Sequence, residues 1–388
     1  MNTIKGFKNS WILTEDGLVK TNLKINNGKI DKIGIFNEDD LIELSSDKIV
    51  VPGFIDEHIH GALGSDVIDG INLHKIASIL PCEGVTAFLP TTTTQKIEII
   101  DQSLKSIKNY IDKENTKGSK IIGVHLEGPF ISKEYCGAQL SKYIIKPNID
   151  TFKHFYDISG KNIKLVTIAF EEDDNNLTKY LTSNNIKVSI GHSASNYEDV
   201  KNAINNGVTC VTHMYNGMKP LHHREIGTIG SSLLFDELYS ELICDGIHVS
   251  KEGVKLLYKN KPKDKIILIT DALRTKYMPE GIYKELEQVI VVKNKEARLT
   301  DGTLAGSVLK MNEAIKNYMD FTGCNFIDAI KCATENPAKN LGIFDIMGSI
   351  KENKEANFVI VDKNLNVYQT IRNGHIIYSK EGESIYEK

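Results

Sequence analysis

Residues that can bind a metal ion, move a proton or bind an anion stand at the ends of apolar runs in this 388-residue chain. Histidine and carboxylate side chains together form the donor set that zinc, iron(II), cobalt and manganese accept. The pattern therefore predicts a site for a divalent metal, built by segments far apart in the sequence. The candidates are His58, His60, Glu127, His192, His213, His248 and Asp271.

His58 and His60 are separated by one residue, so on a strand both side chains face the same way. Taken alone, the pair has an ordinary alternative, because histidines also serve as hydrogen-bonded core or surface residues. The recurrence of His192, His213 and a carboxylate at the ends of other runs favours metal ligation over that alternative.

Asp271 follows the apolar run "IILIT". A carboxylate held there can take the proton from a water that a metal ion has made acidic. The alternative is a helix cap, since Thr-Asp-Ala can begin a helix, but the need for a base beside such a water favours the catalytic role. His125 shares the direction of Glu127 and lies deeper in its run, so we expect a supporting or core histidine rather than a ligand.

Eight apolar runs between residues 50 and 272 are continuous rather than alternating, which is typical of parallel strands buried on both faces. Eight such strands with helices between them predict an α/β fold, a (β/α)8 TIM-type barrel, whose strand ends meet at one mouth. The segment 53–344 slightly exceeds the ~250 residues typical of that fold, and we expect the surplus in loops. The runs are "IVVPGFIDEHIH", "GVTAFLPTT", "KIIGVHLEG", "KLVTIAF", "KVSIGHS", "TCVTHMYN", "ELICDGIHV" and "KIILITDA".

The two ends of the chain have a different character. Short β-rich runs there are separated by the turn signals Asn27-Gly28 and Asn373-Gly374, which predict hairpins. We expect residues 1–52 and 345–388 to pair into one small β-sandwich domain beside a barrel domain at 53–344.

Composition limits the partners. With 41% hydrophobic and 25% charged residues and a formal net charge of −4, the chain is of ordinary globular composition, and its lysines are interleaved with acids. We therefore expect no nucleic-acid partner. The six cysteines form no CxxC pair, the N-terminal region lacks the apolar stretch of a signal peptide, and no segment approaches 18 apolar residues. These features predict a cytoplasmic protein without a membrane segment.

Seven motifs are spread over essentially the whole chain: "PGFIDEHIHG" (52–61), "HLEGPFIS" (125–132), "IGHSAS" (190–195), "THMYNGM" (212–218), "DGIHV" (245–249), "ITDA" (269–272) and "GTLAGS" (302–307). Together they resemble the amidohydrolase superfamily, and within it the N-acetylglucosamine-6-phosphate deacetylase family.

The resemblance implies that Glu127, His192 and His213 hold one metal ion. It also implies that Asp271 belongs to the metal site and is the catalytic acid and base. Members that keep the His-x-His pair can hold two ions bridged by the glutamate, so one or two ions are expected here. Dihydroorotase-like relatives instead use a carbamylated lysine at the end of the fourth strand. This chain reads "KLVTIAFEE" there, with no lysine at that end.

The resemblance also implies contacts with a sugar phosphate and, because the arginine of relatives reaches the ligand of a neighbouring subunit, a homodimer. An arginine and a histidine are suitable phosphate partners. Where many relatives read Gly-Ala-His, this chain has Gly-Ala-Gln, so a glutamine amide would have to replace a histidine near the reacting carbonyl. The implied contacts are Ala138, Gln139, Asn216, Gly217, Arg224, His248, Leu304, Ala305 and Gly306.

The implied activity is removal of the acetyl group from N-acetylglucosamine 6-phosphate, with Asp271 acting first as general base and then as general acid. Three alternatives stay open at this point. The chain could act on another N-acetylhexosamine phosphate such as the galactosamine epimer, it could hydrolyse a cyclic amide, or it could be an inactive barrel kept as a scaffold.

Overall fold

Parallel strands form the centre of the molecule, which we describe from a computed structural model covering residues 3–113, 117–285, 287–382 and 385. One sheet has the order β10-β9-β6, and a second has six strands in chain order. All neighbouring pairs in both sheets are parallel, which confirms the predicted α/β class. The strands are β6 (Phe54–Ile59), β9 (Val85–Pro90), β10 (Lys120–Ile121), β11 (Val124–Glu127), β12 (Ile163–Ile168), β13 (Lys187–Ile190), β14 (Cys210–Val211), β15 (Tyr239–Ile243) and β16 (Ile266–Ile269).

Two isolated parallel bridges connect the two sheets. Thr91, directly after β9, pairs with His125 of β11, and Ile59 of β6 pairs with Ala272, which follows β16. The bridges therefore connect the three-stranded sheet to both sides of the six-stranded sheet, next to β11 and next to β16.

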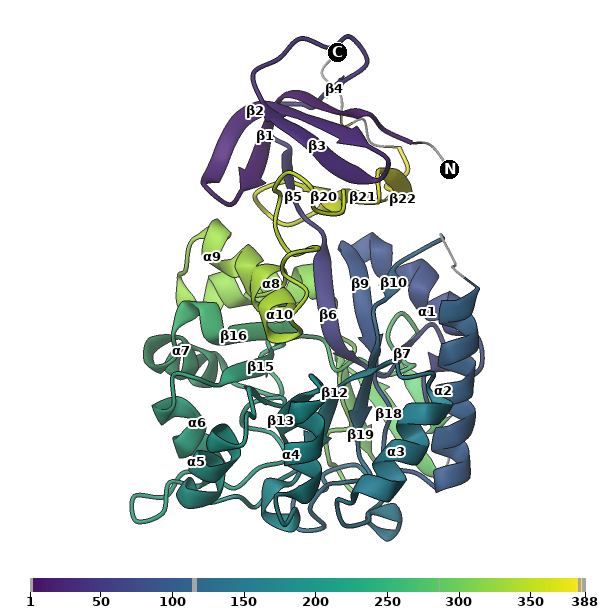
Figure 1. Cartoon of the computed structure of the whole chain (residues 1–388), viewed down its shortest axis with the longest axis vertical. Coiled ribbons are helices and arrows are strands. Elements are labelled where there is room, and N and C mark those ends of the chain that lie inside the picture. Colours follow the sequence, from purple (N-terminus) through teal and green to yellow (C-terminus); the bar gives the residue numbers. More distant parts are fainter. Residues whose placement is uncertain (1–2, 114–116, 286, 383–384, 386–388) are drawn as a thin grey trace.

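Helices alternate with the strands and cover them (Figure 1). In α2 the buried positions Ile100, Ser103, Leu104 and Ile107 recur at the spacing of one helix face. The helices are α1 (Leu73–Ile79), α2 (Ile97–Asp112), α3 (Ile149–Ile158), α4 (Asn176–Ser183), α5 (Tyr197–Asn205), α6 (Gly227–Leu234), α7 (Lys251–Asn260), α8 (Met311–Thr322), α9 (Phe326–Lys331) and α10 (Glu335–Asn340).

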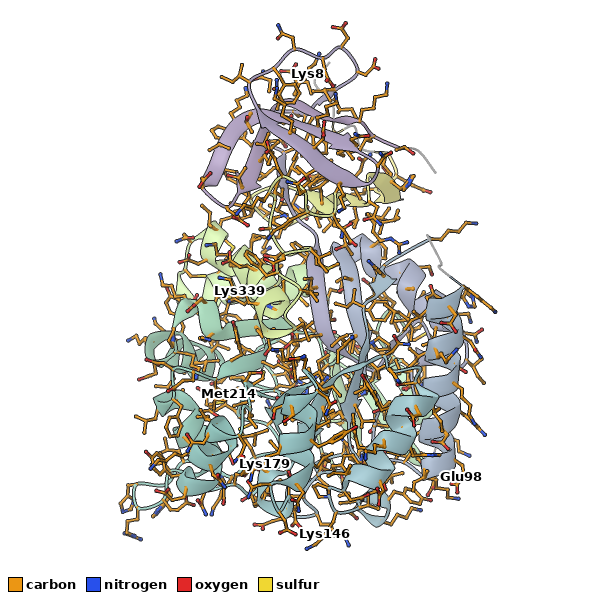
Figure 2. The ribbon with its side chains drawn as sticks, in the orientation of Figure 1. Lys8, Glu98, Lys146, Lys179, Met214 and Lys339 are labelled. Atoms are coloured by element: carbon orange, nitrogen blue, oxygen red, sulfur yellow. The ribbon has the colours of Figure 1, made fainter. Side chains whose placement is uncertain are left out.

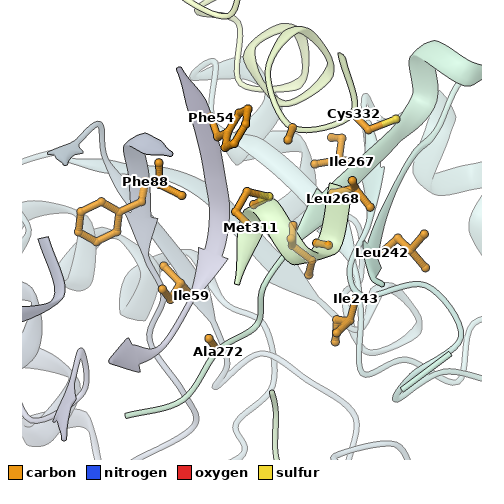
Figure 3. Packing of buried hydrophobic residues seen from close by; sticks show 14 of the residues in the cluster. Phe54, Ile59, Phe88, Leu242, Ile243, Ile267, Leu268, Ala272, Met311 and Cys332 are labelled. Carbon is orange, nitrogen blue, oxygen red and sulfur yellow. The ribbon is translucent and has the colours of Figure 1, made fainter. Parts of the chain in front are cut away.

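The main core lies between these helices and the parallel strands. Phe54 of β6, Phe88 of β9, Leu268 of β16 and Met311 of α8 belong to this one core cluster, part of which Figure 3 shows, and all four are fully buried. Of the residues labelled in Figure 2, Glu98, Lys146, Lys179 and Lys339 are exposed, whereas Met214 is buried. Burial of this apolar set fixes the strands from which the site is built.

The terminal segments form a separate sheet with the order β22-β21-β20-β5-β1-β2-β3, in which β4 also pairs with β1. Both predicted hairpins are confirmed: Asn27-Gly28 and Asn373-Gly374 join paired strands with positive φ at both residues of each turn. The strands are β1 (Gly6–Thr14), β2 (Gly17–Asn26), β3 (Lys29–Gly34), β4 (Ile42–Glu43), β5 (Ile49–Pro52), β20 (Phe358–Val361), β21 (Val367–Arg372) and β22 (His375–Ser379).

The first of the predicted runs is two strands, because β5 pairs in the terminal sheet and β6 in the parallel one. The chain passes between them at Gly53, where a Cβ atom would lie 2.2 Å from the Thr86 hydroxyl. In Figure 1, β6 and β9 run away from the terminal sheet, so their carboxyl ends lie at the far end of the parallel strands.

The expectation that the surplus length of the central segment lies in loops is wrong in part. The segment contains an antiparallel sheet of β17 (Gly281–Glu285), β18 (Gln288–Lys293) and β19 (Glu296–Leu299), and a short hairpin of β7 (Gly61–Ala62) and β8 (Ser65–Asp66). The turn between β18 and β19 is Asn294-Lys295, with φ of 52° and 64°. Its sequence is not the Asn-Gly pair that typically predicts a hairpin with this geometry.

Candidate metal centre

Glu127, His192 and His213 converge although they come from three different strand ends. Their ligand atoms lie within 4.8 Å of one another, and all three side chains are buried. Glu127 Oε1 is 3.2 Å from His192 Nε2 and 3.1 Å from His213 Nε2. The two histidine Nε2 atoms are 3.1 Å apart.

His58, His60 and Asp271 form a second group of the same kind. Asp271 Oδ1 lies 3.5 Å from His58 Nε2 and 3.1 Å from His60 Nε2. The other oxygen of Glu127, Oε2, lies 3.6 Å from His58 Nε2 and 3.3 Å from His60 Nε2. One glutamate therefore faces both groups, each through a different oxygen.

The orientation of the four imidazole rings tests whether these residues fit a metal ion. Each Nδ1 faces an oxygen that can only accept, so each ring carries a proton there and turns the lone pair of Nε2 into the site. Neutral lone pairs about 3 Å apart repel each other unless a cation lies among them, so the donor set fits a divalent metal. The acceptors are Glu241 Oε2 for His58 (3.0 Å) and the carbonyls of Thr91 for His60 (3.2 Å), Tyr135 for His192 (2.8 Å) and Asn216 for His213 (3.1 Å).

Electrostatics in the protein without metal lead to the same conclusion. Burial opposes protonation of His60, but Asp271 and Glu127 outweigh it and raise its pKa to about 10. Burial opposes ionisation of Asp271, but His58 and His60 outweigh it and lower its pKa to about 2. The carboxylates thus hold positive charge in the site, which protons supply when no metal does.

The backbone at three of these residues is unusual. His192, His213 and Asp271 have φ of 47°, 30° and 46°, and each stands two residues beyond the end of its strand. This left-handed conformation is sparsely populated for residues with a side chain and costs of order 1–3 kcal/mol. It redirects each side chain immediately after the strand, at the carboxyl end where the ligands meet.

Glu171 secures the loop that begins with His192. Its carboxylate accepts hydrogen bonds from the backbone N of Ala194 and from the hydroxyls of Ser193 and Ser195. Ser132 N also donates to the His192 carbonyl at 2.8 Å. These bonds offset the strain at His192 and fix the position of its ring.

A cavity opens beside both groups. It is lined by His60, Glu127, His192, His213 and Asp271, and by part of the antiparallel sheet through Gln288 and Ile290. The structure brings eight of the nine residues predicted to contact substrate to this cavity: Ala138, Gln139, Asn216, Gly217, His248, Leu304, Ala305 and Gly306.

Arg224 is the exception. It lies on an exposed loop, where its Nη1 is 2.8 Å from His223 Nε2, and it is not among the residues lining the cavity. A role at the ligand of a neighbouring subunit stays a prediction.

Gln139 has a fixed orientation in the cavity. Its Oε1 accepts from the backbone N of Thr94 at 2.8 Å, so its NH2 group faces inward and lies 3.3 Å from His192 Nε2. A hydrogen-bond donor therefore points toward the metal ligands.

His248 lies in the loop after β15 rather than at the strand end where its run placed it. Its Nδ1 donates to Asp245 Oδ2 at 2.7 Å, and the backbone N atoms of Ile247 and His248 donate to Asp245 Oδ1. Burial lowers the pKa of His248, but Asp245 outweighs it and the net shift is upward. The ring is thereby suited to facing an anion.

His125 does not join either group around Glu127 and Asp271. Its Nδ1 faces the Glu57 carbonyl at 3.2 Å, its Nε2 faces the Thr167 hydroxyl at 2.7 Å, and burial holds its pKa well below the usual range. Its ring packs edge-on against His58, with centroids 4.7 Å apart.

Glu241 is a residue of the site that the sequence interpretation missed. It lies in the apolar strand β15, is fully buried, and contacts His58. A glutamate in the middle of a buried strand is itself a signal, because such a charge is costly without partners. Burial and the adjacent Glu241 carboxylate raise the pKa of Glu57 well above its usual range.

Histidine and carboxylate groups gathered at the carboxyl ends of parallel strands define a metal-dependent α/β hydrolase. Residues 49–377 match the sequence profile described as "Amidohydrolase family", and the chain belongs to this family. None of the helices in the described part of the chain has the length and apolarity needed to span a membrane.

Relatives of this chain carry a more specific name. N-acetylglucosamine-6-phosphate deacetylase of Bacillus subtilis (strain 168) is 39% identical over 385 residues, covering 96% of this chain and 97% of that protein. N-acetylgalactosamine-6-phosphate deacetylase of Escherichia coli O157:H7 is 33% identical over 325 residues, covering 83% and 86%. The crystal structure of N-acetylglucosamine-6-phosphate deacetylase from Thermotoga maritima is 36% identical, covers 97% of this chain and 100% of that chain, and superimposes with a TM-score of 0.89. The predicted family is confirmed, and the structural likeness implies a TIM-type barrel.

Proposed function

We propose that this chain removes the acetyl group from N-acetylglucosamine 6-phosphate, giving glucosamine 6-phosphate and acetate. The observation that carries the proposal is the convergence of two histidine-carboxylate groups on Glu127 at the wall of a cavity. That cavity also contains the inward-facing amide of Gln139 and the ring of His248, which suit an acetamide oxygen and a phosphate respectively.

Glu127, His192 and His213 would hold one divalent ion, and His58 and His60, which Glu127 also faces, would hold a second one. When bound, such an ion lowers the pKa of a coordinated water and polarises the acetamide carbonyl.

Asp271 takes the proton of the attacking water while the new C–O bond forms, because its carboxylate stands among the ligands on the cavity side. It then delivers that proton to the sugar nitrogen as the C–N bond breaks. Gln139 donates a hydrogen bond to the carbonyl oxygen as negative charge develops on it. His248 faces the phosphate.

Acetate release from N-acetylglucosamine 6-phosphate by the purified protein tests the proposal. We expect turnover that a chelator removes and an added divalent ion restores. Absence of turnover in the metal-loaded protein contradicts it, and a hydantoin or dihydropyrimidine assay then examines cyclic-amide hydrolysis.

A second candidate substrate is the galactosamine epimer, because the relative from Escherichia coli O157:H7 is an N-acetylgalactosamine-6-phosphate deacetylase. The two sugars differ only in the configuration of one hydroxyl group. Ratios of kcat/KM for the two epimers, measured on the same preparation, decide between them.

We also infer the finer architecture. Closure of the parallel strands into a (β/α)8 barrel is supported by the bridges Thr91–His125 and Ile59–Ala272 at the two sheet edges. A β-sandwich-like domain of residues 1–52 and 345–388, beside a barrel at 53–344, is supported by a second hydrophobic cluster. That cluster includes Phe7, Leu23 and Phe358 and lies within the terminal sheet.

A homodimer would supply a cationic side chain to the substrate cavity. No lysine or arginine is among the residues that line the cavity in the described part of the chain, although a phosphate needs cationic partners. Arg224 of a second copy would supply one. A cytoplasmic location agrees with all six cysteines being free.

A further inference from the structure

Glu241 is fully buried in β15, and two donors to one of its carboxylate oxygens help to hold a charge there. Its Oε2 accepts from His58 Nδ1 at 3.0 Å and from the backbone N of His213 at 3.2 Å. Removing a carboxylate from water costs several kcal/mol, so a glutamate persists in such a place only with good donors. Both of its donors belong to residues of the metal centre.

The bond to His58 decides how that ring can bind. With the proton held on Nδ1, Nε2 presents its lone pair toward Glu127, Asp271 and the Nε2 of His60. The other three histidines of the centre are held by backbone carbonyls. Within the described part of the chain, His58 is therefore the histidine of the centre that a carboxylate orients, and a carboxylate also raises the basicity of the ring it holds.

The surroundings leave His58 little freedom. The His125 ring packs edge-on against it at 79°, and Glu57, beside Glu241, accepts from Asn340 Nδ2 at 3.0 Å. Glu241 is thus held by the packing of β6, β15 and α10 in the position from which it reaches His58.

We propose that Glu241 is a positioning residue that acts through His58 and sets the affinity of the second ion of the centre, the one held by His58 and His60. This inference rests on the proposed metal-dependent function. It also assigns a different consequence to each half of the centre. When Glu241 is changed, the ion on Glu127, His192 and His213 keeps its three side chains, and only a backbone hydrogen bond of His213 is lost. The ion on the His-x-His pair instead loses the bond that orients the ring of a ligand, His58.

Metal binding tests this inference directly. Wild-type protein, Glu241→Ala, Glu241→Gln and Cys210→Ala are stripped with a chelator and titrated with Co²⁺, and bound metal per chain is measured by mass spectrometry. Cys210 lies beside Glu241 and Glu57, and its thiol faces the Val211 carbonyl, so its variant controls for a small void in the same place. We expect two ions in the wild type and in Cys210→Ala.

In Glu241→Ala we expect the second binding step to weaken by about 10- to 100-fold, with the first step changed least. Glu241→Gln should lie between, because its amide oxygen can still accept from His58 Nδ1. The visible spectrum of the second Co²⁺ should change in both Glu241 variants. A merely structural role would instead lower the melting temperature of the metal-free protein below that of Cys210→Ala and weaken both steps alike.

The outcomes separate this inference from the proposed function. Two ions bound at wild-type affinity in both Glu241 variants overturn the role of Glu241. A single ion in the wild type at every concentration overturns it too, while acetate release by that protein leaves the deacetylase proposal standing. Failure of the wild type both to bind metal and to release acetate overturns both. If Glu241→Ala does not fold, Glu241→Gln provides the measurement.

Discussion

His192 Nε2 lies 3.1 Å from His213 Nε2, and neither ring can turn away, because the Nδ1 of each is held by a backbone carbonyl. Left-handed backbone at both residues fixes the rings further. Such an arrangement places two nitrogen lone pairs against each other unless a cation lies between them. It indicates that the centre is pre-organised for metal by the fold rather than assembled by the ion.

Glu127→Gln should remove most of the bound metal and lower acetate release by more than about 100-fold, since Glu127 faces both groups and its charge attracts the ions. Metal content and turnover measured on one preparation check this expectation. The exposed Glu252→Gln provides a matched control and should behave as wild type. Full metal content in Glu127→Gln would contradict the bridging role.

Asp271→Asn should keep its metal and lose about 10²- to 10⁴-fold in kcat, the range that a positioned proton-transfer group contributes. Asparagine is the appropriate replacement because it tolerates the positive φ of 46° at this position, whereas alanine would add backbone strain. Metal analysis separates loss of the proton acceptor from loss of the site. Wild-type turnover in this variant would exclude Asp271 as the acid and base.

The sequence was more informative about the residues of the site than about the contacts that hold those residues in position. His58 and His60 were recognisable because one-residue spacing on a strand gives a common direction, and the two hairpins because Asn-Gly turns tolerate positive φ. In each case the structure depends on neighbours in the chain. Local signals of this kind can be read without knowing the tertiary fold.

The support around the ligands depends on distant segments. The carbonyl of Tyr135 holds His192 because a loop from another strand passes beside it, and no residue type marks a carbonyl for this role. The antiparallel sheet with Gln288 was likewise assigned to loops. Glu241 is a signal that the sequence does carry, because it is a charged residue in the middle of the apolar strand β15. The sequence interpretation used only the apolar character of that strand and missed it.

Gln139→Ala should lower kcat by roughly 10²-fold with metal content unchanged, the usual effect of losing one donor to a developing oxyanion. The expectation follows from the amide orientation that Thr94 N imposes through Oε1. Steady-state kinetics should therefore show a change mainly in kcat rather than in KM. Gln102→Ala on the exposed side of α2 is the control. A change in KM alone would assign Gln139 to ground-state binding.

Arg224→Ala should raise KM for the phosphorylated substrate by about 10- to 100-fold, as expected for losing a charge-assisted bond of about 1.5–3 kcal/mol. Turnover of unphosphorylated N-acetylglucosamine should not change, because no phosphate is present to contact. Mixed dimers of this variant with Asp271→Asn test the subunit origin of the arginine. Some activity should return, since one of the two sites then combines an intact Asp271 with an intact Arg224. Light scattering that shows only monomers would contradict the shared site.

Glu15 provides a prediction for stability that is independent of the metal centre. It accepts from Lys351 at 2.8 Å and from Ser349 at 2.7 Å, joining the turn after β1 to the segment before β20. Burial opposes its ionisation, but Lys351, Ser349 and Lys354 outweigh it and lower its pKa to about 2.

Because the pKa of Glu15 is lower in the folded chain than in the unfolded one, its contribution is complete above the unfolded pKa of about 4.5 and is lost as pH falls toward 2. Glu15→Gln should therefore lower the free energy of unfolding by about 1 kcal/mol at neutral pH. The difference from wild type should shrink between pH 4.5 and 2. Urea unfolding of the metal-free proteins at several pH values measures it, with the exposed Asp39→Asn as control for one lost charge. A difference that stays constant down to pH 2 would show that the carboxylate charge does not stabilise this contact.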